Sequence, residues 1–341
     1  MPIIILIVSF LCALFLTPLI KWSAIRFGIV DAPDHRKIHK HPIPLMGGVA
    51  VGISFIVGII FGNLQALIFP LILLTLLFLA FGALDDGGYK MHARIKIIVH
   101  LIFSGIFVLG FGIHLSIFQD LWVNNLLTIC FITFMTNSTN MLDGMDGLVS
   151  GIAIIAAGFF ALIAVSVGQI EVVIISLALM GGALGFLKYN FNPASIFLGE
   201  GGSTFIGFIL AFLAIKLDFG ALCNIPIGNI SISLQLVDFI VLLVLLGIPI
   251  FDTYFVFTNR FLHKIKFNQP GIDHSHHRIH LMGFSQRATV MTLYAVQIIL
   301  GFLALALTRA DLIQYLALLG IVAMFFVGFT ILLLQVKVYE S

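Results

Sequence analysis

Two adjacent aspartates, Asp85 and Asp86, lie at the end of an apolar stretch in a chain with few charges. A charged side chain near hydrocarbon costs about 2.5–3.5 kcal/mol or more, so such residues usually mark a pathway or a catalytic site. Neighbouring carboxylates at a low-dielectric boundary need a cation or a proton to relieve their repulsion, and a divalent metal or a role as general base would provide it. Arg94 and Lys96 follow at helical distance, where they could hold anionic phosphates. The alternative is a solvated loop with ordinary basic anchors.

A second polar group occupies residues 137–147. Four of its side chains recur every three residues: Asn137, Asn140, Asp143 and Asp146. This spacing places them along one helical stripe before glycines end it. Oxygen-rich side chains of this kind suit Mg²⁺, which prefers carboxylates plus substrate phosphates. A helix-capping loop is the alternative, because Asn, Asp and Gly all favour helix termini, but four polar residues in register within so apolar a chain favour a functional site.

The third group, residues 188–203, contains Asn190 and a glycine-rich turn with Glu200 that opens a new helix. Such turns expose backbone N–H groups, and the helix dipole favours anions there. A carboxylate in the same turn would repel phosphate unless a metal bridges them, so Glu200 is predicted to bind metal. A plain helix N-terminus capped by Ser203 is the alternative.

The fourth group is a dense basic patch in residues 273–280. It contains His274, His276, His277 and Arg278. Imidazole and guanidinium groups suit a diphosphate, and we favour that interpretation. Zinc binding is the competing hypothesis, because clustered histidines are frequent zinc ligands.

A fifth, basic segment lies between residues 35 and 48 and includes Arg36, Lys37, His39 and Lys40. Taken alone, it is typical of the positive residues that anchor a membrane protein on its inner side.

Composition decides the environment in which these groups act. Of 341 residues, 61% are hydrophobic and only 9% are charged, and the mean hydropathy is +1.18. Soluble domains carry about 25% charged residues, so the sequence predicts an all-α integral membrane protein with a single domain, 1–341. The first apolar stretch has no basic leader or cleavage site and is interpreted as a span. The three cysteines are far apart, which makes a disulfide framework unfavourable.

Alternation of apolar runs and polar breaks predicts about eleven transmembrane helices. Their expected cores are 3–22, 45–62, 66–84, 97–112, 122–137, 147–167, 172–188, 203–216, 237–256, 288–307 and 312–334. With the first turn inside, fifteen of the seventeen Lys and Arg residues fall on the cytoplasmic side, and only Lys216 and Arg309 fall outside. The N-terminus is then outside and the C-terminus cytoplasmic. The expected active-site loops, about 23–44, 85–96, 137–147, 188–203 and 257–287, all lie on the cytoplasmic side of the plasma (inner) membrane.

Together these residues resemble the polyprenyl-phosphate N-acetylhexosamine-1-phosphate transferases of the glycosyltransferase family 4 type. Six motifs carry the resemblance: R-K-x-H with P-I-P-x-x-G-G (Arg36 to Gly48), the Asp85–Asp86 pair, N-x-x-N-x-x-D-G-x-D-G (Asn137 to Gly147), N-x-x-P-A with F-L-G-x-x-G-S (Asn190 to Ser203), I-P-x-x-D (Ile248 to Asp252) and H-x-H-H-R (His274 to Arg278). The last motif is similar to the N-acetylglucosamine branch, whereas the muramoyl-pentapeptide branch has three consecutive histidines.

The resemblance implies a role for each matching residue. Asp85 is implied as the base on the lipid phosphate, with Asp86 beside it. Glu200 stands where the family usually has a metal-binding Asp, and Asn140 would share the metal. The implied substrate-binding residues are Lys96, Asn137, Asp143, Asp146, Asn190, His274, His276, His277, Arg278, Arg36 and His39. Because Glu is one methylene longer than Asp, Mn²⁺ is an alternative to the expected Mg²⁺.

The sequence therefore predicts a Mg²⁺-dependent phosphotransferase. It would move a sugar 1-phosphate from a UDP-N-acetylhexosamine, with N-acetylglucosamine expected, to undecaprenyl or a related polyprenyl phosphate, and would release UMP. This would be the first membrane step of a cell-envelope polysaccharide such as lipopolysaccharide or O-antigen. The bilayer is an expected partner, nucleic acid is not, and a homodimer stays open. The alternatives are a phospho-N-acetylmuramoyl-pentapeptide transferase and a proton-coupled transporter. The transporter predicts acids spread over both faces and repeated halves, whereas in this sequence the acids crowd one face and no internal repeat is visible.

Overall fold

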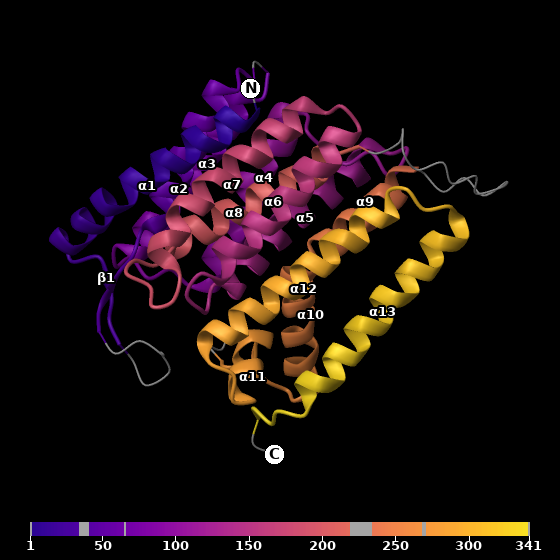
Figure 1. The fold of residues 1–341 in the computed structure, drawn as a ribbon. Helices are drawn as coiled ribbons and strands as arrows, with labels where there is room; N and C mark the ends of the chain where they lie inside the picture. Colours follow the sequence, from indigo (N-terminus) through magenta and orange to yellow (C-terminus); the bar gives the residue numbers. More distant parts are fainter. Residues whose placement is uncertain (1, 34–40, 65, 219–233, 268–270, 340–341) are drawn as a thin grey trace.

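A computed structural model describes residues 2–33, 41–64, 66–218, 234–267 and 271–339, and in these ranges the protein is almost entirely α-helical (Figure 1). The helices are α1 (Pro2–Arg26), α2 (Gly47–Phe61), α3 (Ile68–Asp86), α4 (Ala93–Phe111), α5 (Leu121–Leu142), α6 (Leu148–Ser166), α7 (Ile170–Asn190), α8 (Gly199–Lys216), α9 (Leu234–Leu245), α10 (Gly247–Leu262), α11 (Ser275–Leu281), α12 (Gln286–Leu307) and α13 (Leu312–Leu334). A two-residue antiparallel hairpin, β1 (Val30–Asp31) with β2 (Ile43–Pro44), links α1 to α2. The hairpin and α11 lie at the same end of the helices as the C-terminus (Figure 1).

The eleven predicted spans each coincide with a helix or a helix pair. Eight helices of the described chain are long and apolar enough to cross a membrane, which confirms an integral membrane protein. Three predicted spans fall outside this group: α2 has only 15 residues, α5 is rich in Asn and Thr, and the span predicted at 237–256 falls on the bent pair α9 and α10. The count of eleven and the sidedness of the termini stay predictions. The two termini do lie at opposite ends of the helices, as an odd number of crossings requires (Figure 1).

The span predicted at 237–256 is broken into two helices. α9 and α10 meet at an angle of 82° around Leu246. Pro249 lies in the first turn of α10, where its missing N–H does no harm but where it cannot continue α9. The side-chain amide of Gln297 in α12 donates to the carbonyl of Leu245 at 2.7 Å, so a backbone acceptor freed by the break has a partner.

The most buried helix, α8, packs directly against the backbones of its neighbours. A Cβ placed on Gly82 of α3 would lie 2.0 Å from the nitrogen of Gly201, and one on Gly48 of α2 would lie 2.1 Å from the Cα of Gly202. Small residues permit such close approach between membrane helices, where packing replaces the hydrophobic effect as the driving force. These contacts bring the first turn of α8, with Glu200, to the end of α3, with Asp85 and Asp86.

Replacement of Gly82 by alanine tests this packing. The added methyl group has no room, so Gly82→Ala should destabilise the protein by about 1–3 kcal/mol or more. The matched control is Gly105→Ala in α4, whose Cβ would meet no atom within 4 Å. Thermal unfolding of both variants in detergent measures the effect. An unchanged midpoint for Gly82→Ala would contradict the close contact between α3 and α8.

Candidate active site

The predicted polar groups converge on one cavity of about 1560 Å³ at the end of the helices that carries the hairpin and α11. The structure places nine of the sequence-predicted residues in its wall: Asp85, Asp86, Lys96, Asn140, Asp143, Asp146, Asn190, Glu200 and His277. They come from the ends of α3, α5, α7 and α8, from the loop between α5 and α6, from the first turn of α4 and from α11. Groups separated by up to about two hundred residues in the sequence therefore share one chamber at the edge of an apolar helix bundle.

Lys96 is the electrostatic centre of this chamber. Its Nζ lies 2.7 Å from Oδ2 of Asp85 and 2.9 Å from Oε2 of Glu200, so one ammonium joins α3, α4 and α8. The other oxygen of Asp85 accepts the backbone N–H of Met91 at 2.8 Å. With most of each side chain withdrawn from solvent, these charge-assisted bonds are stronger than exposed ion pairs.

The first turn of α8 is fixed by side chains from two other helices. Asn140 donates to Oε2 of Glu200 at 3.1 Å, and the Ser203 hydroxyl donates to Oδ1 of Asn140 at 2.8 Å. The backbone N–H of Glu200 donates to Oδ1 of Asp86 at 3.2 Å. The carboxylate of Asp86 thus occupies the helix N-terminus, where the helix dipole favours an anion.

This donor set fits the divalent cation that the resemblance implies. Oε1 of Glu200 is buried and has no hydrogen-bond partner within the described chain. Asp85, Asp86 and Glu200 supply three carboxylates against one ammonium, Lys96, which leaves a net charge of minus two when all are ionised. Mg²⁺ prefers such oxygen ligands. Asn140, however, already bonds Glu200 and Ser203, so here it positions Glu200.

The 143–147 loop combines a solvent-shielded acid with groups that hold the loop in shape. Burial, and then the charges of Asp86, Glu200 and Asp146, raise the pKa of Asp143 to about 8. Asp146 accepts from the Asn192 amide and from the Ala194 N–H, each at 2.9 Å. Asp143 is therefore the acid of this loop that is most sensitive to a cation or a proton.

Asn190 connects this loop to α6 and to the following turn. Its Oδ1 accepts from the N–H of Gly147 at 3.1 Å and from the Ser150 hydroxyl at 3.2 Å, and its amide donates to the carbonyl of Ile196. Gly147 has a φ of 77°, a left-handed conformation that favours glycine. Although Asn190 reaches the cavity wall, its amide is committed to shaping the surrounding loops.

Of the histidine motif, only His277 lines the cavity. Burial, and then His274, lower the pKa of His277 to about 4, so the ring is neutral at pH 7. His274 bonds Asp252 of α10 through Nδ1 at 2.7 Å. His276 is fully buried, and its Nε2 lies 2.3 Å from where a Cβ on Gly144 would be, which leaves room only for glycine there.

Arg278 is directed away from the cavity. Its guanidinium donates to the carbonyls of Asp273, Leu333 and Val336, and it is 2% exposed. It therefore ties α11 to the end of α13 instead of reaching the chamber where phosphates would lie.

A buried ion pair that no sequence pattern indicated connects α10 to the residues that lead into α11. Arg260 of α10 contacts both oxygens of Asp273, at 2.6 and 2.7 Å, and Tyr339 also donates to this carboxylate. Burial alone would raise the pKa of Asp273, but the bonds from Arg260 and Tyr339 lower it to about 2. In the sequence, Arg260 was only one of the fifteen basic residues assigned to the cytoplasmic side. No periodic pattern indicates that it would pair with Asp273.

Asn137 is not part of the chamber wall. Its Oδ1 faces Nδ1 of His100 in α4 at 3.3 Å, and its amide donates to the carbonyl of Thr133. The predicted stripe therefore divides between helix packing and the chamber. Arg36 and His39 lie outside the described residues.

Known proteins share this sequence pattern. The glycosyl transferase family 4 model matches residues 68–218. A Bacillus subtilis protein described as a probable undecaprenyl-phosphate N-acetylglucosaminyl 1-phosphate transferase is 31% identical over 317 residues, which cover 90% of this chain and 85% of that protein. The chain belongs to glycosyl transferase family 4.

Members of this family with different donors are similarly close. The decaprenyl-phosphate N-acetylglucosaminephosphotransferase of Mycolicibacterium smegmatis is 27% identical over 82% of this chain and 75% of its own length. The phospho-N-acetylmuramoyl-pentapeptide-transferase of Bacillus mycoides is 30% identical over 87% of this chain and 95% of its own length. This chain is therefore a polyprenyl-phosphate sugar-phosphate transferase of the membrane, whose sugar donor these identities do not separate.

Removal of the Asp273 carboxylate tests whether its buried ion pair with Arg260 stabilises the protein. In Asp273→Ala the buried Arg260 would lose its partner, which costs about 3–5 kcal/mol. The matched control is Glu171→Gln, which removes a half-exposed pair with Lys216 at 3.7 Å and should cost about 0–1 kcal/mol. Thermal or denaturant unfolding in detergent compares them. Equal effects of the two substitutions would contradict a structural role for the buried pair.

Proposed function

We propose that this protein transfers N-acetylglucosamine 1-phosphate from UDP-N-acetylglucosamine to undecaprenyl phosphate, or a related polyprenyl phosphate, and releases UMP. The reaction takes place at the cytoplasmic face of the plasma membrane and begins the synthesis of a cell-envelope polysaccharide. The observation that carries the proposal is the chamber in which Lys96 links Asp85 and Glu200 beside the 143–147 loop. A chamber of about 1560 Å³ has room for both a nucleotide sugar and a lipid phosphate headgroup.

The chemistry is a displacement at phosphorus. An oxygen of the lipid phosphate attacks the sugar-bearing phosphorus of the donor, the bond to the uridine-bearing phosphate breaks, and UMP leaves with that oxygen. Phosphate monoesters have a second pKa near 6, so the acceptor is largely dianionic at pH 7 and needs little help from a base. Asp85 therefore acts mainly to orient the acceptor and to remove any remaining proton.

Charge neutralisation is the main task of the protein in such a transfer. Lys96 supplies the fixed positive charge of the chamber, and its two ion pairs hold it beside the reacting phosphates. Glu200, through its unpartnered oxygen, and Asp86 are the residues that would hold Mg²⁺. The bound ion would offset charge on the donor diphosphate. Asn140 and Ser203 keep the Glu200 carboxylate in place.

Two features of the sequence support N-acetylglucosamine as the donor sugar. The relative with 31% identity is named for undecaprenyl phosphate and N-acetylglucosamine 1-phosphate, and the H-x-H-H-R motif is similar to that branch. His277 is the member of this motif that reaches the chamber, so it is the histidine placed to contact the donor. The second candidate is a phospho-N-acetylmuramoyl-pentapeptide transferase, which the 30% identity to the Bacillus mycoides protein favours.

A donor panel decides between the two candidates. Purified protein with Mg²⁺ and undecaprenyl phosphate should release UMP from UDP-N-acetylglucosamine at least tenfold faster than from UDP-N-acetylmuramoyl-pentapeptide, about 1.4 kcal/mol of discrimination. Released UMP and the mass of the lipid product are measured. Faster reaction of the pentapeptide donor would identify the second function, and absence of UMP with every UDP-sugar would exclude the proposed reaction.

Substitutions of the charged residues test their roles. Asp85→Asn, Lys96→Met and Glu200→Gln should each lower the rate of UMP release by at least a hundredfold, because each removes a charge at the reacting phosphates. Glu171→Gln at the far end of α7 should keep the full rate, and thermal unfolding shows whether each variant is folded. A folded Glu200→Gln protein with full activity would refute the metal assignment.

A further inference from the structure

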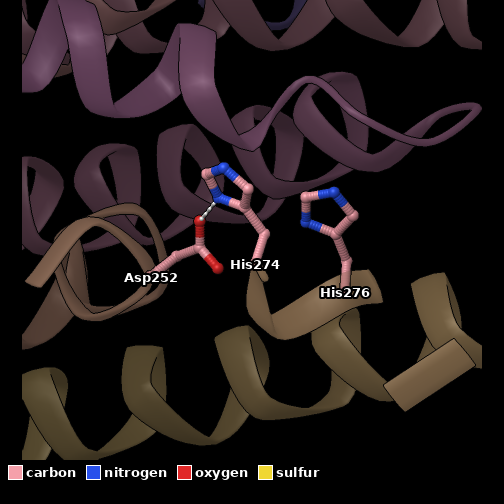
Figure 2. Close-up of side chains that lie close together, drawn as sticks. All are labelled: Asp252, His274 and His276. Carbon is pink, nitrogen blue, oxygen red and sulfur yellow. Dashed lines mark hydrogen bonds and ion pairs between the residues drawn. The ribbon is translucent and has the colours of Figure 1, made fainter. Parts of the chain in front are cut away.

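Three metal-ligating side chains lie together between α10 and α11, beside the chamber but outside its wall. One ligand atom each from Asp252, His274 and His276 lies within 4.8 Å of the others, and Figure 2 shows the three side chains gathered there. Asp252 and His276 are fully buried, and His274 is 9% exposed. In the described chain this is the one group of three or more His, Cys, Asp or Glu side chains whose ligand atoms all lie within 4.8 Å of one another.

His276 is an unpartnered buried ligand. Neither of its ring nitrogens has a hydrogen-bond partner within the described chain. A buried polar group without a partner destabilises the protein, so the site gains stability by acquiring one. An imidazole nitrogen without a hydrogen-bond partner has a lone pair that can bind a metal ion.

Asp252 has the support that a metal-ligating carboxylate requires. Its Oδ1 accepts from the backbone N–H of Ser275 at 2.7 Å and from the Ser275 hydroxyl at 2.6 Å. Its Oδ2 lies 2.7 Å from Nδ1 of His274, as the dashed line in Figure 2 shows. The hydrogen bonds from Ser275 to Oδ1 fix the orientation of the carboxylate, as in other protein metal sites, and an ion would reach Oδ2 by taking the place of the His274 proton.

We propose that Asp252, His274 and His276 form a site for a transition metal ion of the Zn²⁺ type, separate from the Mg²⁺ expected at Glu200. Two imidazoles and a carboxylate are typical zinc ligands, whereas Mg²⁺ prefers oxygen alone. The ion replaces the Nδ1 proton that His274 shares with Asp252, and this proton is released or moves to Nε2. Zinc bonds of about 2.0–2.2 Å require His276 to turn toward the pair.

The ion would have a structural effect on the chamber. Asp252 belongs to α10, and the two histidines begin α11, so one ion cross-links these helices. His277 follows His276 directly and carries the motif into the chamber wall. Binding should therefore raise the thermal stability of the protein, because the ion binds the folded state alone.

Metal content of the purified full-length protein tests the proposal. The protein is stripped with a chelator, incubated with ZnCl₂, passed through a desalting column and analysed by inductively coupled plasma mass spectrometry. We expect one Zn²⁺ per chain for the wild type. His276→Gln should lower the affinity at least tenfold, and Ser275→Ala, which keeps all three ligands, should lower it by about 10–100-fold. His280→Gln is the matched control, because its ring bonds the carbonyl of Phe284 outside the cluster and should leave zinc binding unchanged.

Two further measurements keep the result independent of catalysis and of misfolding. Zn²⁺ should raise the thermal midpoint of the stripped wild type, and Mg²⁺ at the same concentration should not reproduce this shift. Glu200→Gln, which is expected to be inactive, should still bind one Zn²⁺. Absence of bound zinc and of any midpoint shift in the wild type would overturn the proposal, as would unchanged affinity in a folded His276→Gln protein.

Discussion

The double ion pair of Lys96 is the interaction on which the candidate site depends. It joins the end of α3, the start of α4 and the start of α8, and it places one positive charge between two carboxylates at the margin of an apolar bundle. Without it, the carboxylates of Asp85 and Glu200 would have no positive charge between them. With Lys96 in place, the three carboxylates still carry more negative charge than the single ammonium can neutralise. The chamber therefore attracts cations, while the ion pairs stabilise the folded protein.

This arrangement requires helices that approach closely. The turn that contains Glu200 reads in the sequence as a glycine-rich loop suited to phosphate, and the structure gives its glycines another purpose. Gly201 and Gly202 lie against the backbones of α3 and α2, and a Cβ on Gly202 would lie only 2.5 Å from the Cα of Gly48. The N-terminus of α8 in turn receives the carboxylate of Asp86. The same few residues therefore set the distance between helices and the position of the acids.

Many residues of the chamber were predictable because a membrane protein contains few charged residues, and those it has usually serve a function. Every acid near hydrocarbon needs a reason, and Asp85, Asp86 and Glu200 could be expected to meet on one side. The sequence could not separate residues that face the chamber from those that hold loops, since both are buried and polar. Asn190 and Arg278 are of the second kind, with their donors and acceptors committed to backbone groups. The break between α9 and α10 and the pair of Arg260 with Asp273 arise from tertiary contacts that no local pattern records.

The chamber has two walls that are built differently. The acidic wall belongs to tightly packed helices, and its residues are fixed by contacts between α2, α3 and α8. The wall that contains His277 belongs to α11, a helix of 7 residues that is too short to be stable by itself. Its position depends on Asp252 and Arg260 from α10 and on backbone carbonyls near the end of α13, a helix that packs on α10 through Phe326 and Phe251. In the proposed reaction the phosphate chemistry takes place at the acidic wall, which is held by close helix packing. The wall that carries the histidine motif is the one that substitutions in α10, α11 and α13 can shift. Differences in donor sugar between relatives are therefore expected to arise from the anchoring of α11 more than from the acidic residues.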